Sequence, residues 1–342
     1  MNALVLEEYN KFVYKDVPKP VASDDEVLVE IKAVGICGSD VHGMDGSTGR
    51  RIPPIIMGHE ASGVIVETGK NVSGWSAGDR VTFDSTIYKL DDWYTRNGHY
   101  NLSDNRMVLG VSCKEFRRDG AFAQFVNIPA HILYRIPANV SFEQAAMVEP
   151  VAVALHSINL SGIKINDTVA VFGSGMIGLF IIQLLKQAGC TVIAVDVLQE
   201  KLEMAKAAGA AMVFNSSTED VPSEIRKVTN NRGADVAFEA VGITQSVKTA
   251  IESLRKGATL ILVGNLSPVV ELPLQKVVTQ EISVKGSCAI NGEYPAVLDL
   301  ISNGKINVDS MMSAIAPLSE GASYFERLHN KEQGLMKVIL KP

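Results

Sequence analysis

A strand, a glycine-rich turn and a helix follow one another without interruption near the middle of this chain. The β-branched run Thr168–Phe172 leads into the turn Gly173–Gly178, which reads Gly-Ser-Gly-Met-Ile-Gly and opens an apolar helical pattern. Strand and helix patterns then alternate to about residue 286. Because parallel strands need crossover helices that cover both faces of their sheet, this alternation predicts an α/β fold with a doubly wound parallel sheet.

Three glycines mark the predicted ends of crossover helices. Gly189, Gly209 and Gly257 each follow a helical run. A glycine at that position can adopt the left-handed conformation that closes the last turn of a helix. We therefore expect one helix to end just before each of these glycines.

The glycine turn predicts a Rossmann-type dinucleotide site. Gly173 permits the tight turn, Gly175 lets the backbone approach a pyrophosphate, and Gly178 allows the helix to pack closely on the strand. Asp196 ends the next predicted strand roughly 20 residues further on, where a carboxylate accepts hydrogen bonds from an adenosine ribose. Its charge would repel the phosphate of NADP, so NAD is the expected cofactor. The expected cofactor-binding residues are Gly173, Gly175, Ile177, Gly178, Asp196 and Lys201.

The N-terminal part of the chain has a different pattern, with short β-branched runs separated by Gly, Pro and Asp. The runs are 27–31, 63–68, 80–83 and 125–128. This pattern predicts a β-rich domain over residues 1 to about 150. After about residue 286 the alternation of strands and helices is lost, so we expect the tail of the chain to return to this first domain.

Composition excludes several classes of partner. The chain has 342 residues, 46% of them hydrophobic, and a net charge of -6 without a block of basic residues. Two domains with full cores are possible at this length, and nothing attracts nucleic acid or an anionic membrane surface. The most apolar stretch, 169–195, is interrupted by Gln183 and Lys186, so a membrane span is not expected. The expected ligand is a small soluble molecule.

The cysteines and the N-terminal segment indicate a cytoplasmic protein. The first residues are acidic where a signal peptide would be basic. The four cysteines lie far apart, in no pattern that suggests disulfides or a multi-cysteine metal site. Cys113, Cys190 and Cys288 are interpreted as small buried residues.

Three further segments place potential metal ligands beside glycine or proline. Cys37 lies within Gly35–His42, His59 and Glu60 lie within Gly58–Ala61, and Glu149 precedes Pro150. A thiolate, an imidazole and a carboxylate suit zinc, and three protein ligands with an open fourth position describe a catalytic site. Taken singly, none of these residues can be told from an ordinary core or surface residue.

Taken together and in order, these motifs resemble the zinc-containing medium-chain dehydrogenases over essentially the whole chain. The resemblance rests on GICGSDVH, MGHEASGVIVETG, AGDRV, the Glu-Pro pair at 149–150 and the glycine turn. It is closest to the sorbitol (polyol) branch, with butanediol and threonine dehydrogenases as relatives. It implies a GroES-like catalytic domain over 1–151, completed by 288–342, and a Rossmann domain over 152–287. It also implies a homodimer or homotetramer, with the strand near 282–284 as a candidate pairing edge.

The resemblance also implies the roles of individual residues. Ser39 matches the hydroxyl that relays the alcohol proton, and His42 matches a further relay residue of some members. The implied zinc ligands are Cys37, His59, Glu60 and Glu149. The implied catalytic residues are Ser39, His42, Glu60 and Glu149. The implied activity is that of an oxidoreductase, which transfers hydride from a secondary alcohol or polyol, including a sugar alcohol or its phosphate, to NAD+ and yields a ketone.

Two departures from the family pattern refine this expectation. Many relatives hold a second, structural zinc with four cysteines, but this chain has Lys89, Asp92, Thr95 and Ser103 at those positions. We therefore predict one catalytic zinc per chain and no structural zinc. A small aromatic cluster is expected to support the region instead. Its members would be Tyr88, Trp93, Tyr94 and Tyr100.

The second departure concerns the substrate. Sorbitol-type enzymes carry an Arg-Tyr pair that faces the polyol, whereas this chain has Ala289 and Ile290 there, so sorbitol itself is not expected. A shorter diol, a cyclic polyol, a sugar acid and a sugar phosphate remain open. The candidate groups for binding a phosphate are Arg50, Arg51 and Arg117 or Arg118.

Three alternative functions remain. Butanediol or threonine dehydrogenase activity would use the same site. The zinc-free quinone oxidoreductases of the same superfamily are disfavoured by Cys37, His59 and Glu149. A non-catalytic dinucleotide-binding protein is compatible with the fold alone, but the presence of Ser39 beside a complete ligand set favours an enzyme.

Overall fold

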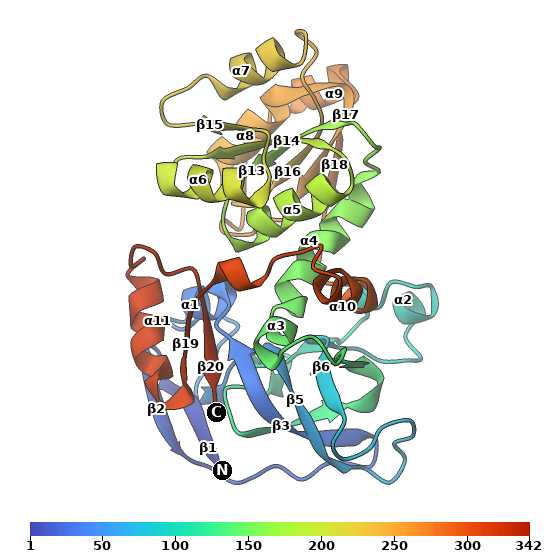
Figure 1. Cartoon of the computed structure of the whole chain (residues 1–342), viewed down its shortest axis with the longest axis vertical. Coiled ribbons are helices and arrows are strands. Elements are labelled where there is room, and N and C mark those ends of the chain that lie inside the picture. Colours follow the sequence, from blue (N-terminus) through green and yellow to red (C-terminus); the bar gives the residue numbers. More distant parts are fainter. The chain divides into compact units, whose positions relative to one another are not determined.

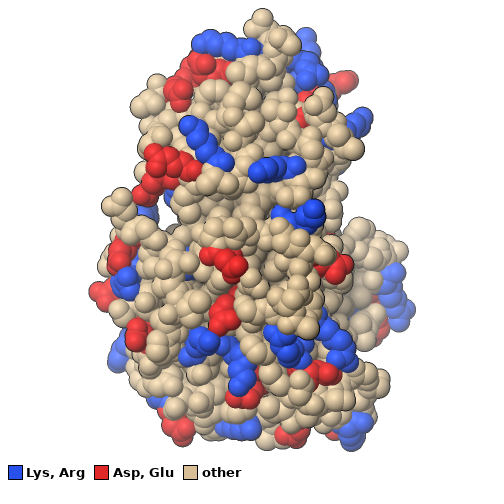
Figure 2. Space-filling model, viewed as in Figure 1, with Lys and Arg blue, Asp and Glu red and all other residues tan.

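The computed structural model describes all 342 residues, and the chain forms two compact units. Unit 1 consists of Met1–Glu149 and Ile290–Pro342, and unit 2 of Pro150–Ala289 (Figure 1). On the face visible in Figure 2, acidic and basic side chains are intermixed, without a large patch of one sign. None of the helices combines the length and the apolar character needed to cross a membrane.

Unit 2 contains a six-stranded parallel sheet with the order β15-β14-β13-β16-β17-β18. The strands are β13 (Thr168–Phe172), β14 (Thr191–Asp196), β15 (Met212–Asn215), β16 (Ala234–Glu239), β17 (Leu254–Leu262) and β18 (Ser283–Gly286). The helices are α5 (Met176–Gln187), α6 (Gln199–Ala208), α7 (Val221–Val228), α8 (Thr244–Ser253) and α9 (Leu274–Thr279). This strand order confirms the predicted doubly wound Rossmann sheet. The order reverses at β13, so ligands are expected at the carboxyl end of that strand.

Two of the three predicted glycine helix ends are correct. Gly189 and Gly209 have φ of +78° and +117° and follow α5 and α6. The prediction for Gly257 is wrong, because α8 ends at Ser253 and Gly257 lies within β17. The register between β16 and β17 shifts there, so the chain bulges, and Gly257 at φ +66° donates its N–H to the carbonyl of Gln280 at 2.8 Å.

Unit 1 is β-rich, as predicted, and is built around a seven-stranded sheet with β3 at its centre. Its strands are β3 (Glu26–Gly35), β5 (Glu60–Thr68), β6 (Arg80–Phe83), β11 (Phe125–Pro129), β12 (Leu133–Arg135), β19 (Met312–Pro317) and β20 (Lys337–Lys341). Strand β3 pairs antiparallel with β5, β11 and β20. The pairing with β20 brings the C-terminal strand beside the end of β3, where the first metal-ligand motif begins.

Smaller elements complete unit 1. The short strands are β1 (Asn2–Glu8), β2 (Lys11–Asp16), β4 (Ile55–Ile56), β7 (Thr86–Ile87), β8 (Met107–Val108), β9 (Val111–Ser112) and β10 (Arg117–Arg118). The helices are α1 (Gly38–Gly43), α2 (Trp93–Arg96), α3 (Phe142–Ala146), α10 (Tyr294–Ser302) and α11 (Gly321–His329), and α4 (Val148–Ser161) runs from unit 1 into unit 2. Four single 3-10 turns are η1 (Tyr100–Leu102), η2 (Ala130–Ile132), η3 (Asp309–Met311) and η4 (Leu318–Glu320).

All four cysteines are free thiols, and none is fully buried. The interpretation of Cys113, Cys190 and Cys288 as buried core residues is therefore wrong, because each is only half-buried. Each of the three lies just outside a strand, where the chain reaches the surface: Cys113 follows β9, Cys190 precedes β14 and Cys288 follows β18.

The region 88–104, here called the lobe, is organised around the carboxylate of Asp92. One Asp92 oxygen accepts the N–H groups of Tyr94 and Thr95 at 2.9 and 3.2 Å and caps α2, while the other accepts the N–H of Asp104 at 3.2 Å. Asp92 and Thr95 occupy two of the four positions at which relatives are expected to carry zinc-binding cysteines. Hydrogen bonds to the Asp92 carboxylate thus join the start of α2 to Asp104, two segments of the region in which relatives are expected to carry four zinc-binding cysteines.

The expected aromatic cluster is only partly correct. Tyr88 stacks on Tyr100 with ring centroids 4.3 Å apart, whereas Trp93 contacts only Tyr94 edge-on and is 67% exposed. The aromatic residues therefore form two separate pairs and not one cluster.

We expect Asp92→Ala to loosen the lobe, because three backbone N–H groups lose their acceptor at once. The variant should be cleaved by trypsin at Arg96 faster than the wild type, as followed by mass spectrometry of the fragments. Asp91→Ala is the matched control, since Asp91 is exposed and caps nothing. Equal cleavage rates for the two variants would show that Asp92 does not hold the lobe.

Candidate active site

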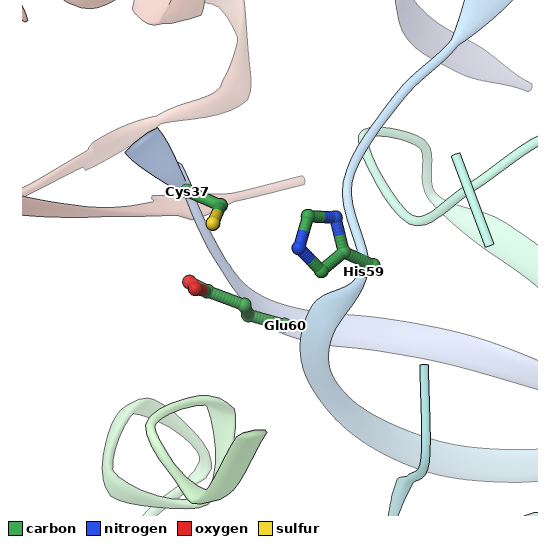
Figure 3. Close-up of side chains that lie close together, drawn as sticks. All are labelled: Cys37, His59 and Glu60. Carbon is green, nitrogen blue, oxygen red and sulfur yellow. The ribbon is translucent and has the colours of Figure 1, made fainter. Parts of the chain in front are cut away.

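The pairing of β3 with β5 brings three of the four predicted zinc ligands together. Gly35 at the end of β3 lies opposite Glu60 at the start of β5, and Cys37 and His59 lie just beyond these two ends. The ligand atoms of Cys37, His59 and Glu60 all lie within 4.8 Å of one another. Figure 3 shows a ring nitrogen of His59 and the carboxylate of Glu60 turned toward the sulfur of Cys37.

Two glycines make this arrangement possible. Gly58 has φ +95°, a left-handed conformation that sets the direction of the chain into His59. At Gly35 a Cβ atom would lie 2.4 Å from Oε2 of Glu60, so a larger residue there would displace that carboxylate. The motif glycines thus shape the ligand cluster itself.

The chemistry of the cluster fits a zinc ion. His59 and Glu60 are 6% and 1% exposed, and burial, followed by the charge of Glu60, raises the pKa of the Cys37 thiol. A half-buried thiol, a buried imidazole and a buried carboxylate in mutual reach are the donor types that zinc prefers. A divalent cation would also stabilise the thiolate that burial alone disfavours.

Glu149, the fourth predicted ligand, is not part of this three-residue cluster. It lies at the start of α4, is 9% exposed, and its Oε1 accepts a hydrogen bond from the hydroxyl of Ser85 at 3.0 Å. Burial raises the pKa of Glu149 to about 7, with His59 lowering it and Glu60 raising it further. Glu149 is therefore close enough to interact electrostatically with the cluster while Ser85 holds its carboxylate.

Sequence reasoning missed a buried ion pair that lies beside His59. Asp40 is fully buried, and its Oδ1 accepts hydrogen bonds from Nε and Nη2 of Arg51 at 3.2 and 2.8 Å. The same oxygen lies 3.7 Å from Nδ1 of His59, which has no hydrogen-bond partner. A carboxylate that accepts a hydrogen bond from the second nitrogen of a metal-binding histidine fixes its ring, but the 3.7 Å separation here is too long for such a bond. The signal was present in the sequence, because Asp40 belongs to the same motif as Cys37.

Arg51 and Arg118, two of the predicted phosphate-binding candidates, are each engaged in an ion pair. Arg51 is 4% exposed and engaged with Asp40, and Arg118 pairs with Glu26 at 2.7 Å. Arg50 and Arg117 are exposed, so they remain candidates.

A second missed residue, Lys337 of β20, lies directly against the ligand cluster. Its Nζ donates to Oε2 of Glu60 at 2.5 Å and to the carbonyl of Ile36 at 3.0 Å. Burial by itself would lower the pKa of Lys337, but the negative charges of Glu60 and Cys37 outweigh burial and raise it. No sequence pattern could reveal this contact, since Lys337 lies far along the chain from Glu60.

Ser39 and His42 both lie on α1, immediately after Cys37. Ser39 is exposed and its hydroxyl donates to Sγ of Cys37 at 3.3 Å, which places it at the edge of the cluster. His42 is exposed as well, three residues further along the helix. Residues with this spacing share one face of a helix.

The glycine turn of unit 2 has the geometry of a dinucleotide-binding loop. Gly173 has φ +93°, and a Cβ at Gly178 would lie 1.8 Å from the carbonyl oxygen of Gly173. Gly175 begins α5 without any side-chain cap, and no atom lies within 4 Å of the place where its Cβ would be. The first N–H groups of α5 are thus open to an anion. Ile177 is half-buried in the first turn of this helix.

Asp196 ties the end of β14 to the glycine turn. Its Oδ2 accepts the N–H of Ser174 at 2.7 Å, and its Oδ1 accepts those of Val197 and Leu198 at 2.8 and 3.0 Å. Lys201 lies nearby in sequence on α6 and is half-buried. Oδ2, which accepts only one of these hydrogen bonds, retains a lone pair for a further donor, whereas Oδ1 already accepts two.

Asp84, which follows β6 and precedes Ser85, is a buried carboxylate that connects the sheet to the lobe. Its oxygens accept the N–H of Thr86 at 2.8 Å and the hydroxyl of Tyr100 at 2.7 Å, and that hydroxyl in turn accepts the N–H of Gly292 at 2.8 Å. Burial raises the pKa of Asp84 from 3.8 to about 6, although the Tyr100 and Thr86 hydrogen bonds oppose the shift.

This shift predicts a pH dependence of stability. Because the folded state holds the Asp84 proton more tightly than the unfolded state does, its stabilising contribution is present below about pH 4 and lost as the pH rises through about 6. Asp84→Asn mimics the protonated form at every pH. Relative to the wild type, its free energy of unfolding should improve by about 3 kcal/mol between pH 4 and pH 7, as measured by urea denaturation. Asp91→Asn is the control, and a pH-independent difference for Asp84→Asn would contradict the assignment.

Segments of this chain match two domain families of known proteins. Residues 23–138 match the alcohol dehydrogenase GroES-like domain, and residues 177–303 match the zinc-binding dehydrogenase domain. The predicted GroES-like unit is thereby confirmed.

Individual relatives match over almost their full length. D-xylulose reductase from Morganella morganii is 36% identical, with 96% of this chain and 97% of the relative covered. D-arabitol-phosphate dehydrogenase from Enterococcus avium is 31% identical, with 97% and 94% covered. A solved structure described as a zinc-binding dehydrogenase from Sinorhizobium meliloti 1021, bound to NADP, has a TM-score of 0.92 at 32% identity, with 100% and 99% covered.

Proposed function

Since the chain belongs to the zinc-dependent alcohol and polyol dehydrogenase family, we propose that it oxidises a secondary alcohol or polyol, or a sugar alcohol phosphate, to a ketone with NAD+. The observation that carries the proposal is the cluster of Cys37, His59 and Glu60, whose donor atoms lie within 4.8 Å of one another. The free cysteines agree with a reducing compartment, and we propose that the enzyme works in the cytoplasm.

In this proposal Cys37, His59 and Glu60 hold a zinc ion, and Glu149 contributes from the position that Ser85 fixes. When bound there, zinc supplies Lewis-acid chemistry, which lowers the pKa of an alcohol hydroxyl toward neutrality. The Ser39 hydroxyl, at the exposed edge of the cluster, relays the proton that the alcohol releases: it accepts this proton as it passes its own hydroxyl proton on. His42 on the same face of α1 is the next proposed carrier toward solvent.

The glycine turn is proposed to hold the cofactor pyrophosphate. The uncapped N–H groups at the start of α5 bind the anion, and Asp196 accepts a hydrogen bond from the adenosine ribose. The preference for NAD rests on the negative charge of Asp196, which opposes a 2′-phosphate. Ile177 and Lys201 flank this site in the proposal.

Two observations support the proposed substrate class: the names of two relatives, and the apolar residues at positions 289 and 290. One relative is named a reductase of D-xylulose and another a dehydrogenase of D-arabitol phosphate. At the positions where a sorbitol-type pair is expected, Ala289 is half-buried and Ile290 is fully buried, so neither offers a hydrogen bond to a long polyol. We therefore propose a shorter or phosphorylated polyol.

The proposal predicts about one zinc per chain by mass spectrometry and NADH formation with a member of a panel of polyols, diols, sugar acids, threonine and sugar phosphates. Cys37→Ser should lose both zinc and activity. Ser39→Ala should keep its zinc and lose about 100-fold or more in kcat, because only proton transfer is removed.

Three results would each contradict a different part of the proposal. A wild-type protein with neither zinc nor turnover would rule out the dehydrogenase. Two zinc ions per chain would overturn the prediction for the lobe. A higher kcat/KM with NADP+ than with NAD+ would overturn the role given to Asp196.

We also propose that the chain is a homodimer or homotetramer whose subunits pair through β18. This strand lies at the edge of the unit 2 sheet, and all four of its residues are exposed. Exposed apolar side chains lie in the same part of unit 2, with Leu274, Val278 and Val284 at 65%, 66% and 37% exposure. An unprotected apolar edge strand is a template for pairing with another chain.

Val284→Lys tests this proposal, because a charge on the edge strand should block pairing. Its mass by light scattering coupled to gel filtration should fall to half that of the wild type. Val66→Lys, at 36% exposure on β5 of unit 1, is the matched control and should keep the wild-type mass. A wild type that is already monomeric would refute the interface.

A further inference from the structure

The buried lysine beside the ligand cluster has no role in the proposed reaction. Lys337 is 3% exposed, and β20 holds it next to the end of β3 through the pairs Ile339↔Gly35 and Leu340↔Val34. Its ammonium contacts Oε2 of Glu60 and the carbonyl of Ile36. An ammonium taken out of water is costly unless it is paired, and here its anionic partner is a member of the metal-ligand cluster.

Glu60 therefore lies within reach of two cations, the Lys337 ammonium and the proposed zinc ion. One of its oxygens is engaged by Lys337, yet the same side chain lies within 4.8 Å of the donor atoms of Cys37 and His59. Gly35 preserves this contact, because a Cβ there would occupy the space of the oxygen that faces Lys337. The fold thus leaves room for the Glu60 carboxylate to contact Lys337.

The charges of the site balance only when Lys337 is counted. A zinc ion carries two positive charges, whereas the Cys37 thiolate and the carboxylates of Glu60 and Glu149 carry three negative charges. The neighbouring Asp40–Arg51 pair is neutral by itself. Lys337 supplies the remaining positive charge, and buried sites are stable when their charges are compensated in this way.

We propose that Lys337 is a positioning residue that keeps Glu60 an exchangeable rather than a permanent zinc ligand. This inference rests on the proposed zinc site. The ammonium withdraws part of the carboxylate charge from the metal, so that a coordination position stays available to the substrate. Without the lysine, Glu60 would be free to bind the metal permanently, with tighter metal binding and slower turnover.

The test compares Lys337→Met with Lys341→Met in the full-length protein. Lys341 lies on the same strand but forms an exposed ion pair with Glu143, so its loss should leave the metal site unchanged. Zinc affinity is measured by competition with a chelator, and the coordination number by the visible spectrum of the cobalt(II)-substituted protein. For Lys337→Met we expect zinc affinity to rise about tenfold or more, the spectrum to show an added ligand, and kcat to fall.

A double variant keeps the test valid if Lys337→Met folds poorly without metal. Lys337→Met combined with Glu60→Gln replaces the ion pair by neutral groups, which avoids an unpaired buried charge. Because the gain in affinity requires the Glu60 carboxylate, the double variant should bind zinc no more tightly than Glu60→Gln alone.

The outcomes separate this inference from the proposed function. If the wild type binds zinc while Lys337→Met keeps the wild-type affinity and cobalt spectrum, the role of Lys337 is refuted and the dehydrogenase remains. A gain in affinity that persists in the double variant refutes the role as well. If the wild type binds no zinc, the proposed function fails and this inference falls with it.

Discussion

The antiparallel pairing of β3 with β5 is the constraint on which the candidate active site depends. It places Gly35 opposite Glu60, so that Cys37 and His59, which lie just beyond the paired ends, face one another across the strand ends. Backbone hydrogen bonds fix this register, and a shift by one residue would turn the ligand side chains to the opposite face of the sheet. Strand β20 pairs with the other edge of β3 and thereby places Lys337 next to Glu60.

Every carboxylate buried around this point has an identified partner. Asp40 pairs with Arg51, Glu60 with Lys337, and Glu149 accepts from Ser85. Burial without a metal raises the pKa values of the Cys37 thiol and of Glu149, because an apolar environment disfavours the charged forms. A divalent cation relieves this penalty, so metal binding and the deprotonation of its ligands are linked.

The lobe is held together by hydrogen bonds that converge on the carboxylates of Asp92 and Asp84. The Asp92 carboxylate gathers three backbone N–H groups, and Tyr100 connects the lobe to Asp84 and Gly292. A further hydrogen bond runs from the side chain of Asn291 to the carbonyl of Gly98 at 2.8 Å. Hydrogen bonds to a charged group are directional and strong enough to fix such a turn, although they involve fewer atoms than a zinc-thiolate site.

The sequence by itself determined the features that depend on local geometry. The strand, turn and helix around Gly173–Gly178 and the acid at the end of β14 are short-range patterns, because the helix and strand periods and the conformational freedom of glycine act within a few residues. Cys37, His59 and Glu60 were identifiable for a similar reason, since each sits in a glycine-containing motif. Only the tertiary structure decided the bulge at Gly257, the Asp40–Arg51 pair and the contact of Lys337 with Glu60. These depend on the register between strands and on which side chains the fold brings into contact, and no local pattern encodes either.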